Sequence, residues 1–244
     1  MRLTLKTRHK PRPLTFSAGV LLAFMLNTTA QAEISFDGYT RFIFEAEQRQ
    51  IAVILVNESN ESALVQVKLG WGEAQDTRTL PMALSKPLLM IPGQSNASVD
   101  VLYQGAGLPT DRESFFLLKV LQVPKKNSKE NLVPIALQHN LKLFYRPKLP
   151  SSPEEAINTL HWSQSGSATY QARNDSPYYL TLTEVSLRGP KGVACGKTID
   201  HLMIAPSSIY ELPMATCGRP VHEVTYWFIS DGGVPHAYRN EVHR

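Results

Sequence analysis

The sequence predicts an all-β protein made of two antiparallel β-sandwiches joined by a short linker. Three observations support this prediction. Short runs of alternating or continuous apolar residues recur along the chain between polar residues, glycine and proline. Stretches with the apolar period of a helix are almost absent. A proline-rich segment, PKLPSSP at residues 147–153, divides the runs into two sets.

The first set has the strand content of an immunoglobulin-type sandwich. Its runs lie at residues 34–44, 51–58, 63–71, 87–91, 95–103, 114–123 and 132–146. The second set predicts a smaller sandwich, with runs at residues 159–163, 169–174, 178–187, 198–204, 207–212, 221–229 and 237–242. The predicted boundaries are residues 33–147 for the first domain, 148–153 for the linker and 154–244 for the second domain.

Residues 1–32 have the composition of a secretory signal peptide. Basic residues and no acids occupy positions 1–12, an apolar run follows to Leu26, and the segment ends in Ala30-Gln31-Ala32, a favoured cleavage pattern. The apolar run is too short to span a membrane. We therefore expect export and cleavage after Ala32. Loss of the basic segment would turn the formal net charge from +4 to a slightly negative value, so bulk charge does not favour nucleic-acid or membrane binding.

The chain has two cysteines, Cys195 and Cys217. Oxidation is the usual fate of a cysteine pair in an exported protein, so we expect one disulfide in the second domain. A metal site is the alternative, but the sequence around the two thiols shows neither C-x-x-C nor H-x-H spacing.

Motifs for catalysis are weak in this sequence. The nucleophile pattern G-x-S-x-G is absent, and GVACGKT at residues 192–198 is one residue short of a phosphate-binding loop and lies among predicted strands. The histidines are scattered, without the spacing of zinc ligands. These observations make an enzyme the least favoured class.

The most informative segment is LVPIALQHNLKLFYRP at residues 132–147. Val133, Ile135 and Leu137 alternate with other residues and so share one face of a strand. Pro134 cannot donate a ladder hydrogen bond, which suits a strand at a sheet edge. An apolar row on an edge strand favours pairing with another chain. The alternative is an ordinary sandwich strand in which Lys142 extends its ammonium group to solvent.

Several short segments of the sequence resemble motifs of the PapD-like family, the periplasmic pilus chaperones of the chaperone–usher pathway. They are YTRFIF at 39–44, LPTDRES at 108–114, IALQ at 135–138, LKLFYRP at 141–147 and NDSPYY at 174–179. The resemblance covers nearly the whole chain after residue 32. The short charged segment between Val123 and Val133 is similar to the family's short-loop branch.

This resemblance implies two immunoglobulin-like β-sandwich domains at an angle and a non-enzymatic chaperone that needs no cofactor. Such a chaperone binds pilus or fimbrial subunits by donating its seventh strand, here with Val133, Ile135 and Leu137, and delivers them to an outer-membrane usher. A fimbrial subunit or adhesin is the first alternative, although it would lack the complete seventh strand found here. A periplasmic enzyme on a β-sandwich scaffold is the second.

The resemblance also implies the roles of individual charged residues. Arg41 and Lys142 fall on the positions that bind the C-terminal carboxylate of the subunit. Glu113 and Arg146 fall on a buried ion network between the domains. Asp231 is the expected third member, in a turn that is one residue shorter than the family pattern.

Overall fold

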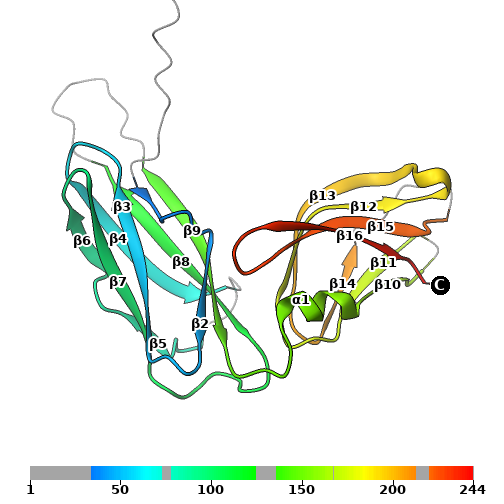
Figure 1. Cartoon of the computed structure of the whole chain (residues 1–244), viewed down its shortest axis with the longest axis horizontal. Helices are drawn as coiled ribbons and strands as arrows, with labels where there is room; N and C mark the ends of the chain where they lie inside the picture. The colour runs from blue at the N-terminus through cyan, green and yellow to red at the C-terminus, as the bar shows by residue number, and fades with distance from the viewer. Residues whose placement is uncertain (1–33, 73–77, 125–135, 167, 213–219, 244) are drawn as a thin grey trace, which may run out of the picture. The chain divides into compact units, whose positions relative to one another are not determined.

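The computed structural model describes residues 34–72, 78–124, 136–166, 168–212 and 220–243 (Figure 1). Residues Glu33–Arg244 form one compact unit. Within it the strands make two separate β-sandwiches, each with its own hydrophobic core. No helix in the described ranges is long and apolar enough to cross a membrane.

The first sandwich packs a four-stranded sheet, in the order β1-β3-β7-β5, against a five-stranded sheet, in the order β2-β9-β8-β4-β6. Its strands are β1 (Ile34–Ser35), β2 (Arg41–Glu45), β3 (Gln50–Asn57), β4 (Ala63–Trp71), β5 (Met82–Leu84), β6 (Leu88–Ile91), β7 (Ser95–Tyr103), β8 (Ser114–Val123) and β9 (Leu137–Arg146).

Alternation of side chains explains this core. On β4, Ala63, Val65 and Val67 are buried while the residues between them are more exposed. This is the pattern of a strand with one face against a core. Large residues such as Phe44 and Phe116 have no exposed surface, and burial of each stabilises the sandwich by about 1.5–3 kcal/mol.

The predicted run at 34–44 is two strands in different sheets, so its prediction as one strand was wrong. Asp37 and Gly38 adopt positive φ angles of 51° and 80° and turn the chain. Before the turn, β1 pairs with β3; after it, β2 pairs in parallel with β9. The short strand β5 was also missed, because three residues are too few to show a period.

Strand β9 has two differently paired halves. It pairs with β8 along its whole length, from Leu137 opposite Gln122 to Tyr145 opposite Ser114. Its pairing with β2 begins only at Lys142. Among the described strands, residues 137–141 thus have a neighbour on one side only. The predicted edge is present there, whereas the second half of β9 lies inside the sheet.

The second sandwich packs a three-stranded sheet, in the order β10-β11-β14, against a four-stranded sheet, in the order β13-β12-β15-β16. Its elements are α1 (Pro153–Ala156), the 3₁₀ turn η1 (Ile157–Thr159), β10 (Leu160–Gln164), β11 (Tyr170–Asn174), β12 (Leu180–Arg188), the 3₁₀ turn η2 (Pro190–Gly192), β13 (Ala194–Ile204), β14 (Ser208–Leu212), β15 (Glu223–Ile229) and β16 (Pro235–Glu241). Every predicted run of this half overlaps a strand. The largest difference is at β13, which begins at Ala194 rather than at residue 198.

The short helix α1 begins inside the predicted linker. Ser152 caps it by accepting a hydrogen bond from the backbone N–H of Glu155, whose carboxylate accepts one from the N–H of Ser152. Pro153 occupies the first turn, where its missing N–H costs nothing. The proline-rich composition that predicted a linker therefore also starts a helix.

The two sandwiches use the same asparagine device, which sequence reading did not detect. Asn57 donates to the carbonyls of Glu61, Ile91 and Pro92 and accepts from Ser59. In the second sandwich, Asn174 donates to the carbonyls of Tyr178, Ile204 and Ala205 and accepts from Ser176. Both asparagines are fully buried, and their bonds satisfy backbone groups that would otherwise be unpaired. The signal in the sequence is N-x-S at the end of β3 and again at the end of β11.

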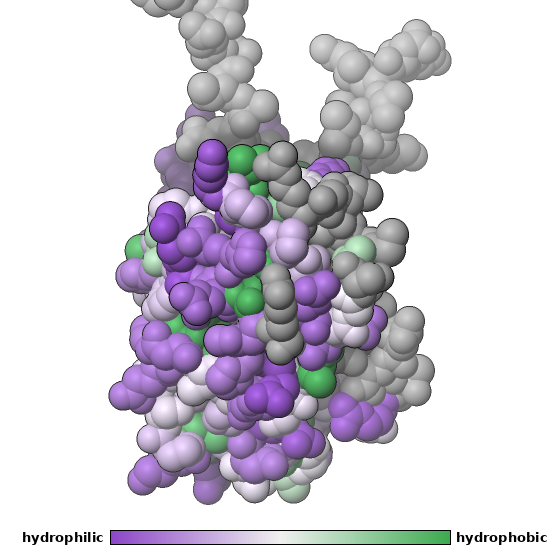
Figure 2. Space-filling model, turned by 90° about the vertical axis from the view of Figure 1, so that its right-hand side faces the viewer, coloured by the Kyte–Doolittle hydropathy of each residue, from purple (hydrophilic) through white to green (hydrophobic). Residues whose placement is uncertain are grey.

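The face shown in Figure 2 is mainly hydrophilic, with hydrophobic residues in small separate groups where the surface is coloured. Scattered apolar residues of this kind are ordinary on a surface in water.

Candidate functional site

Arg41 and Lys142 stand side by side in the five-stranded sheet. They are partners in the parallel register of β2 and β9. Neighbouring strands lie about 4.8 Å apart, and partners in register point to the same face. The pairing of these two strands therefore places two cationic side chains together from positions a hundred residues apart in the chain.

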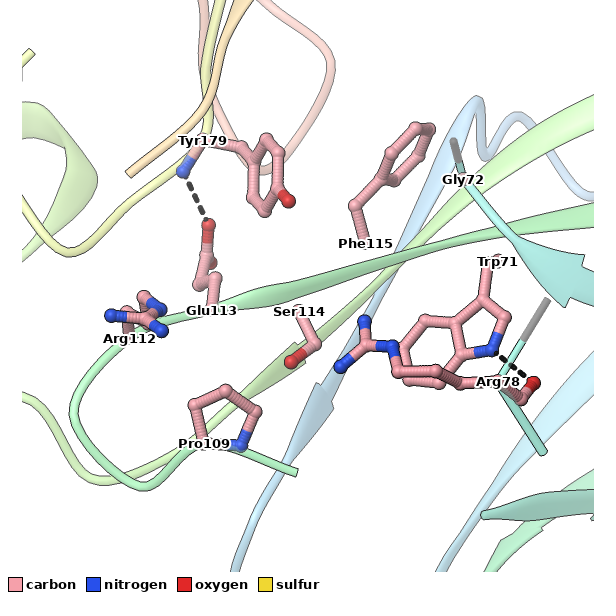
Figure 3. Close-up of a pocket in the computed structure, with 9 residues that line it drawn as sticks. All are labelled: Trp71, Gly72, Arg78, Pro109, Arg112, Glu113, Ser114, Phe115 and Tyr179. Atoms are coloured by element: carbon pink, nitrogen blue, oxygen red, sulfur yellow. Dashed lines mark hydrogen bonds between the residues drawn. The ribbon is translucent and has the colours of Figure 1, made fainter. Parts of the chain in front are cut away.

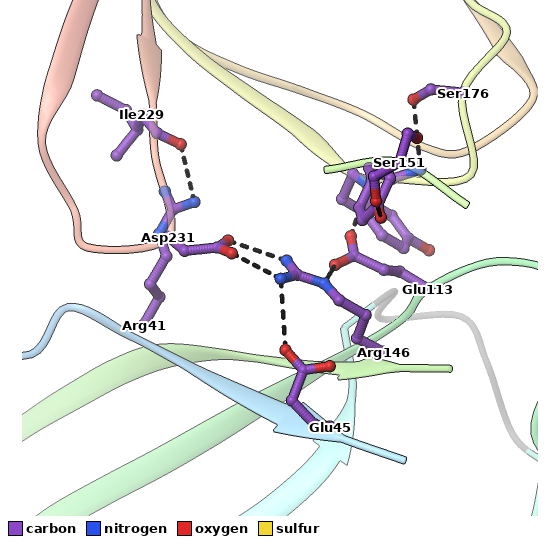
Figure 4. Close-up of polar contacts among 10 residues, drawn as sticks. Arg41, Glu45, Glu113, Arg146, Ser151, Ser176, Ile229 and Asp231 are labelled. Carbon is purple, nitrogen blue, oxygen red and sulfur yellow. Dashed lines mark hydrogen bonds and ion pairs between the residues drawn. The ribbon is translucent and has the colours of Figure 1, made fainter. Parts of the chain in front are cut away.

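Arg41 is buried but is not saturated with hydrogen bonds. Its side chain is buried, and its Nη1 donates to the carbonyl of Ile229 at 3.0 Å (Figure 4). Its Cζ lies 5.9 Å from the ring centre of Phe144. Its Nε is buried and has no partner among the described residues. Burial lowers the pKa of Arg41, and the nearby Asp231 and Glu113 oppose that change.

Lys142 is half-buried and has no carboxylate within ion-pair distance in the described part of the chain. Its Nζ lies 3.1 Å from Nε2 of His201, on β13. Burial, followed by the positive charge of Arg41, lowers the pKa of Lys142 to about 8. Neither cation of the pair forms an ion pair with a carboxylate among the described residues, which suits a carboxylate ligand.

Arg146, at the end of β9, is the centre of an ion network drawn in Figure 4. Its Nε donates to Glu113 at 2.7 Å, and its Nη1 and Nη2 donate to the two oxygens of Asp231 at 2.6 and 2.9 Å. The structure therefore brings all three predicted members of this network together. Glu45 lies 3.6 Å from the same guanidinium and was not predicted.

Burial shifts the pKa values of Arg146 and Glu113 in opposite directions. It would lower the pKa of Arg146, but the bonds to Asp231 and Glu113 outweigh it and raise that pKa. In Glu113, burial raises the pKa to about 7 against the opposing pull of Arg146 and of the Tyr179 N–H, which donates at 2.8 Å. Two carboxylates, those of Asp231 and Glu113, favour the protonated form of Arg146. Among the described residues, Glu113 has a single cationic partner, Arg146, which it shares with Asp231, and its carboxyl group is almost excluded from water.

Because of this raised pKa, we expect a measurable pH dependence of stability at Glu113. Below pH 4.5 the group is protonated in both states; between about 4.5 and 7 it ionises in the unfolded chain but stays protonated in the folded one. Stability from this group should therefore fall by on the order of 3 kcal/mol as the pH rises through that range. The melting temperatures of wild type and Glu113→Gln, measured as a function of pH, should converge or cross as the pH rises. The exposed Glu154→Gln is the matched control, and a difference between wild type and Glu113→Gln that stays constant from pH 4.5 to 8 would refute the assignment.

The segment NDSPYY touches the first sandwich through backbone and rings. The carbonyl of Pro177 accepts from the N–H of Glu113 at 2.9 Å. The ring of Tyr179 lies 5.6 Å from that of Phe115 and 5.7 Å from that of Phe144. The sequence did not predict these contacts, because ring contacts between distant segments leave no local pattern.

A cavity of about 150 Å³ lies beside this network (Figure 3). Charged and aromatic side chains line it, among them Trp71, Arg78, Arg112, Glu113 and Tyr179. The carboxylate of Glu113 points to the N–H of Tyr179 rather than into free space, and its other oxygen binds Arg146. Its titratable group is thus committed to structure, so the cavity does not support the enzyme alternative.

Of the three predicted residues of the donated row, Val133 and Ile135 lie outside the described residues. Leu137 is 42% exposed. It shares its strand face with the buried Leu141 and Leu143, so the core-facing row of β9 runs out into solvent at Leu137.

Comparison with known proteins agrees with this arrangement. Residues 37–150 match the family described as "Pili and flagellar-assembly chaperone, PapD N-terminal domain", and residues 155–240 match "Pili assembly chaperone PapD, C-terminal domain". The chain is 32% identical to the chaperone protein FimB/FhaD of Bordetella pertussis, over 88% of this chain and 91% of that protein. It is 29% identical to the chaperone protein FimC of Escherichia coli, over 92% of each. The crystal structure of the YadV chaperone superposes with a TM-score of 0.73 at 30% identity, covering 86% of this chain and all of that one.

The chain therefore belongs to the PapD family of periplasmic pilus-assembly chaperones, which are not enzymes. Its two sandwiches are the immunoglobulin-like N- and C-terminal domains of that family. The predictions of fold class and of a chaperone function are confirmed, against both the subunit or adhesin and the enzyme alternatives.

Proposed function

We propose that this chain captures a pilus subunit by anchoring the subunit's C-terminal carboxylate on Arg41 and Lys142 and pairing a strand of the subunit with β9. The single observation that carries this proposal is the Arg41–Lys142 pair. The two cations are adjacent in register, partly desolvated and short of anionic partners. A carboxylate would supply the missing charge and accept charge-assisted hydrogen bonds from both.

The open first half of β9 supplies the rest of the binding surface. Residues 137–141 lack a second neighbour among the described strands, so their backbone groups are available for a strand of a partner. Leu137, with Val133 and Ile135 before it in the predicted row, would fill successive pockets of an incomplete subunit sandwich. Each buried side chain would contribute about 1.5–3 kcal/mol.

The anchor would also fix the register of strand pairing. A slip by one residue turns every side chain to the opposite face. A carboxylate bound at Lys142 would define the distance along β9 to Leu137, and so align the apolar row with its pockets. Binding energy then comes from strand pairing and burial, without a nucleotide or other cofactor.

Co-purification tests this proposal. The tagged chain is expressed in the periplasm of cells that also express the fimbrial subunits encoded with it, and bound proteins are identified by mass spectrometry. We expect one-to-one complexes with pilus subunits, which the chain then transfers to an outer-membrane usher. Recovery of the chain alone, or of self-polymers that form by strand exchange, would contradict the proposal.

We further propose that the chain reaches the periplasm by cleavage of residues 1–32, and that its functional domains span 33–147 and 154–244 around the linker. The family matches at 37–150 and 155–240 support these boundaries. The short segment between β8 and β9 supports the short-loop branch; residues 125–135 lie outside the described ranges.

The export proposal includes a disulfide between Cys195 and Cys217. Cys195 is buried, and Cys217 lies outside the described residues. We expect non-reducing mass spectrometry of periplasmic protein to give a chain that starts at Glu33 and takes up alkylating reagent only after reduction. The bond should add about 3 kcal/mol to stability by loop closure. Alkylation of two thiols in the denatured, unreduced protein would contradict the pairing, and a retained N-terminus would contradict the cleavage.

A further inference from the structure

His201 brings a titratable group from the second sandwich to the cationic pair. It lies on β13, and its Nε2 is 3.1 Å from Nζ of Lys142. No motif in the sequence pointed to it. Since Lys142 has no carboxylate partner among the described residues, this imidazole is the polar side chain that contacts its ammonium group.

Two buried polar atoms without hydrogen-bond partners among the described residues belong to residues at or next to the contact between Arg41 and the second sandwich. In the described ranges, Nε of Arg41 and Oγ1 of Thr181 are buried and make no hydrogen bond. Leu182 pairs with Phe228, so the next positions along β12 and β15 are Thr181 and Ile229, whose carbonyl binds Arg41. The free hydroxyl thus lies on the strand segment where Arg41 docks.

Strand register places Thr181 and His201 on one face. His201 is the partner of Thr183, and directly opposed residues in an antiparallel pair share a face. Thr181 and Thr183 are two residues apart and also share it. Although this face points away from the core of the second sandwich, Thr181 is only 2% exposed. The imidazole of His201 therefore reaches Lys142 from the same face of the second sandwich that carries the hydroxyl of Thr181.

We propose that His201 is a third, proton-dependent contact for the C-terminal carboxylate of the subunit, beside Arg41 and Lys142. The inference rests on the proposed function. In the unbound protein, a protonated His201 would place a second cation 3.1 Å from Lys142, so the neutral imidazole accepts a hydrogen bond from the ammonium group. A carboxylate bound between them offsets this repulsion. The imidazole then takes up a proton and donates to the carboxylate.

The charges around His201 are consistent with this switch. Burial lowers its pKa, and Lys142 on β9 and Arg41 on β2 lower it further. Across the sheet it faces Thr183 on β12, and beyond that Trp227 on β15, neither of which titrates near neutral pH. Its neighbour Asp200 on β13 points to the opposite side of the strand. The arriving carboxylate would therefore be the anion that raises the pKa of His201.

A peptide titration tests the inference. The probe is a synthetic 16-residue peptide that copies the C-terminus of the subunit recovered by co-purification, made once as free acid and once as C-terminal amide. For the free acid, we expect wild-type affinity to rise about three- to tenfold between pH 7.0 and 5.5, and for the amide to stay flat. His201→Gln keeps an acceptor for Lys142 but cannot take up a proton, so its affinity for the free acid should show no rise over this pH range.

His236→Gln, an exposed histidine on β16 of the same sheet, is the control and should keep the wild-type rise. If His201→Gln shows the same rise as wild type while wild type still prefers the free acid, the inference is wrong and the proposed function stands. If wild type does not distinguish the free acid from the amide, the carboxylate anchor itself is wrong.

Discussion

Arg41→Ala and Lys142→Ala are each expected to abolish stable complexes with pilus subunits while leaving the chaperone folded. Among the described residues, Arg41 donates one hydrogen bond, to the carbonyl of Ile229, and Lys142 makes one side-chain contact, with His201. Neither side chain belongs to either hydrophobic core. Removal of one partner from a desolvated charge contact costs about 2–5 kcal/mol in binding, which corresponds to a loss of roughly 30- to several-thousand-fold in affinity.

The measurement is co-purification of subunit with each variant from periplasm, together with its melting temperature. Lys119→Ala is the matched control, because Lys119 is an exposed lysine on the adjacent strand β8 and is the register partner of Asn140 rather than of Lys142. We expect wild-type amounts of subunit with Lys119→Ala and almost none with the two anchor variants. Wild-type recovery with either anchor variant would show that the carboxylate binds elsewhere.

The fold could be predicted because its information is local. Period-two alternation, as on β4, identifies strands and their buried faces without knowledge of any partner. The division of the first run into β1 and β2 was missed, since the turn depends on Asp37 in a positive-φ conformation that the alternation does not signal. The identity of the sheet neighbour of β9 was also beyond local reading, because it depends on long-range pairing with β2.

The candidate site divides in the same way. Arg41 and Lys142 were identified by resemblance to a family, and the structure shows that the parallel register of β2 and β9 makes them neighbours. His201 and the carbonyl of Ile229 were not found. Both reach the pair from strands of the second sandwich. The contact from Ile229 is a backbone carbonyl, which every residue has, so the residue type gives no indication of it. Contacts of this kind depend on packing of the two sandwiches within the compact unit, and no spacing along the chain records them.

Leu137→Asp is expected to prevent subunit capture with only a small loss of chaperone stability. Leu137 is 42% exposed at the open edge of β9, so the free chaperone should lose only about 1 kcal/mol of burial energy. In the complex, the same aspartate would be an uncompensated charge in an apolar groove. That costs several kcal/mol, enough to eliminate binding.

Gln138→Asp provides the sharper half of this test. Gln138 is exposed on the opposite face of the same strand, where its side-chain amide donates to Asn140 at 2.9 Å. Both variants introduce the same charge at adjacent positions. If subunit binding depended only on non-specific surface contacts or on net charge, the two variants would lose it equally. Strand addition instead predicts that Leu137→Asp recovers no subunit and Gln138→Asp recovers most of it, because only one face of β9 enters the groove. Equal damage by the two variants, or a Leu137→Asp chaperone that melts many degrees below wild type, would mean that this part of β9 serves the chaperone's own fold rather than the subunit's.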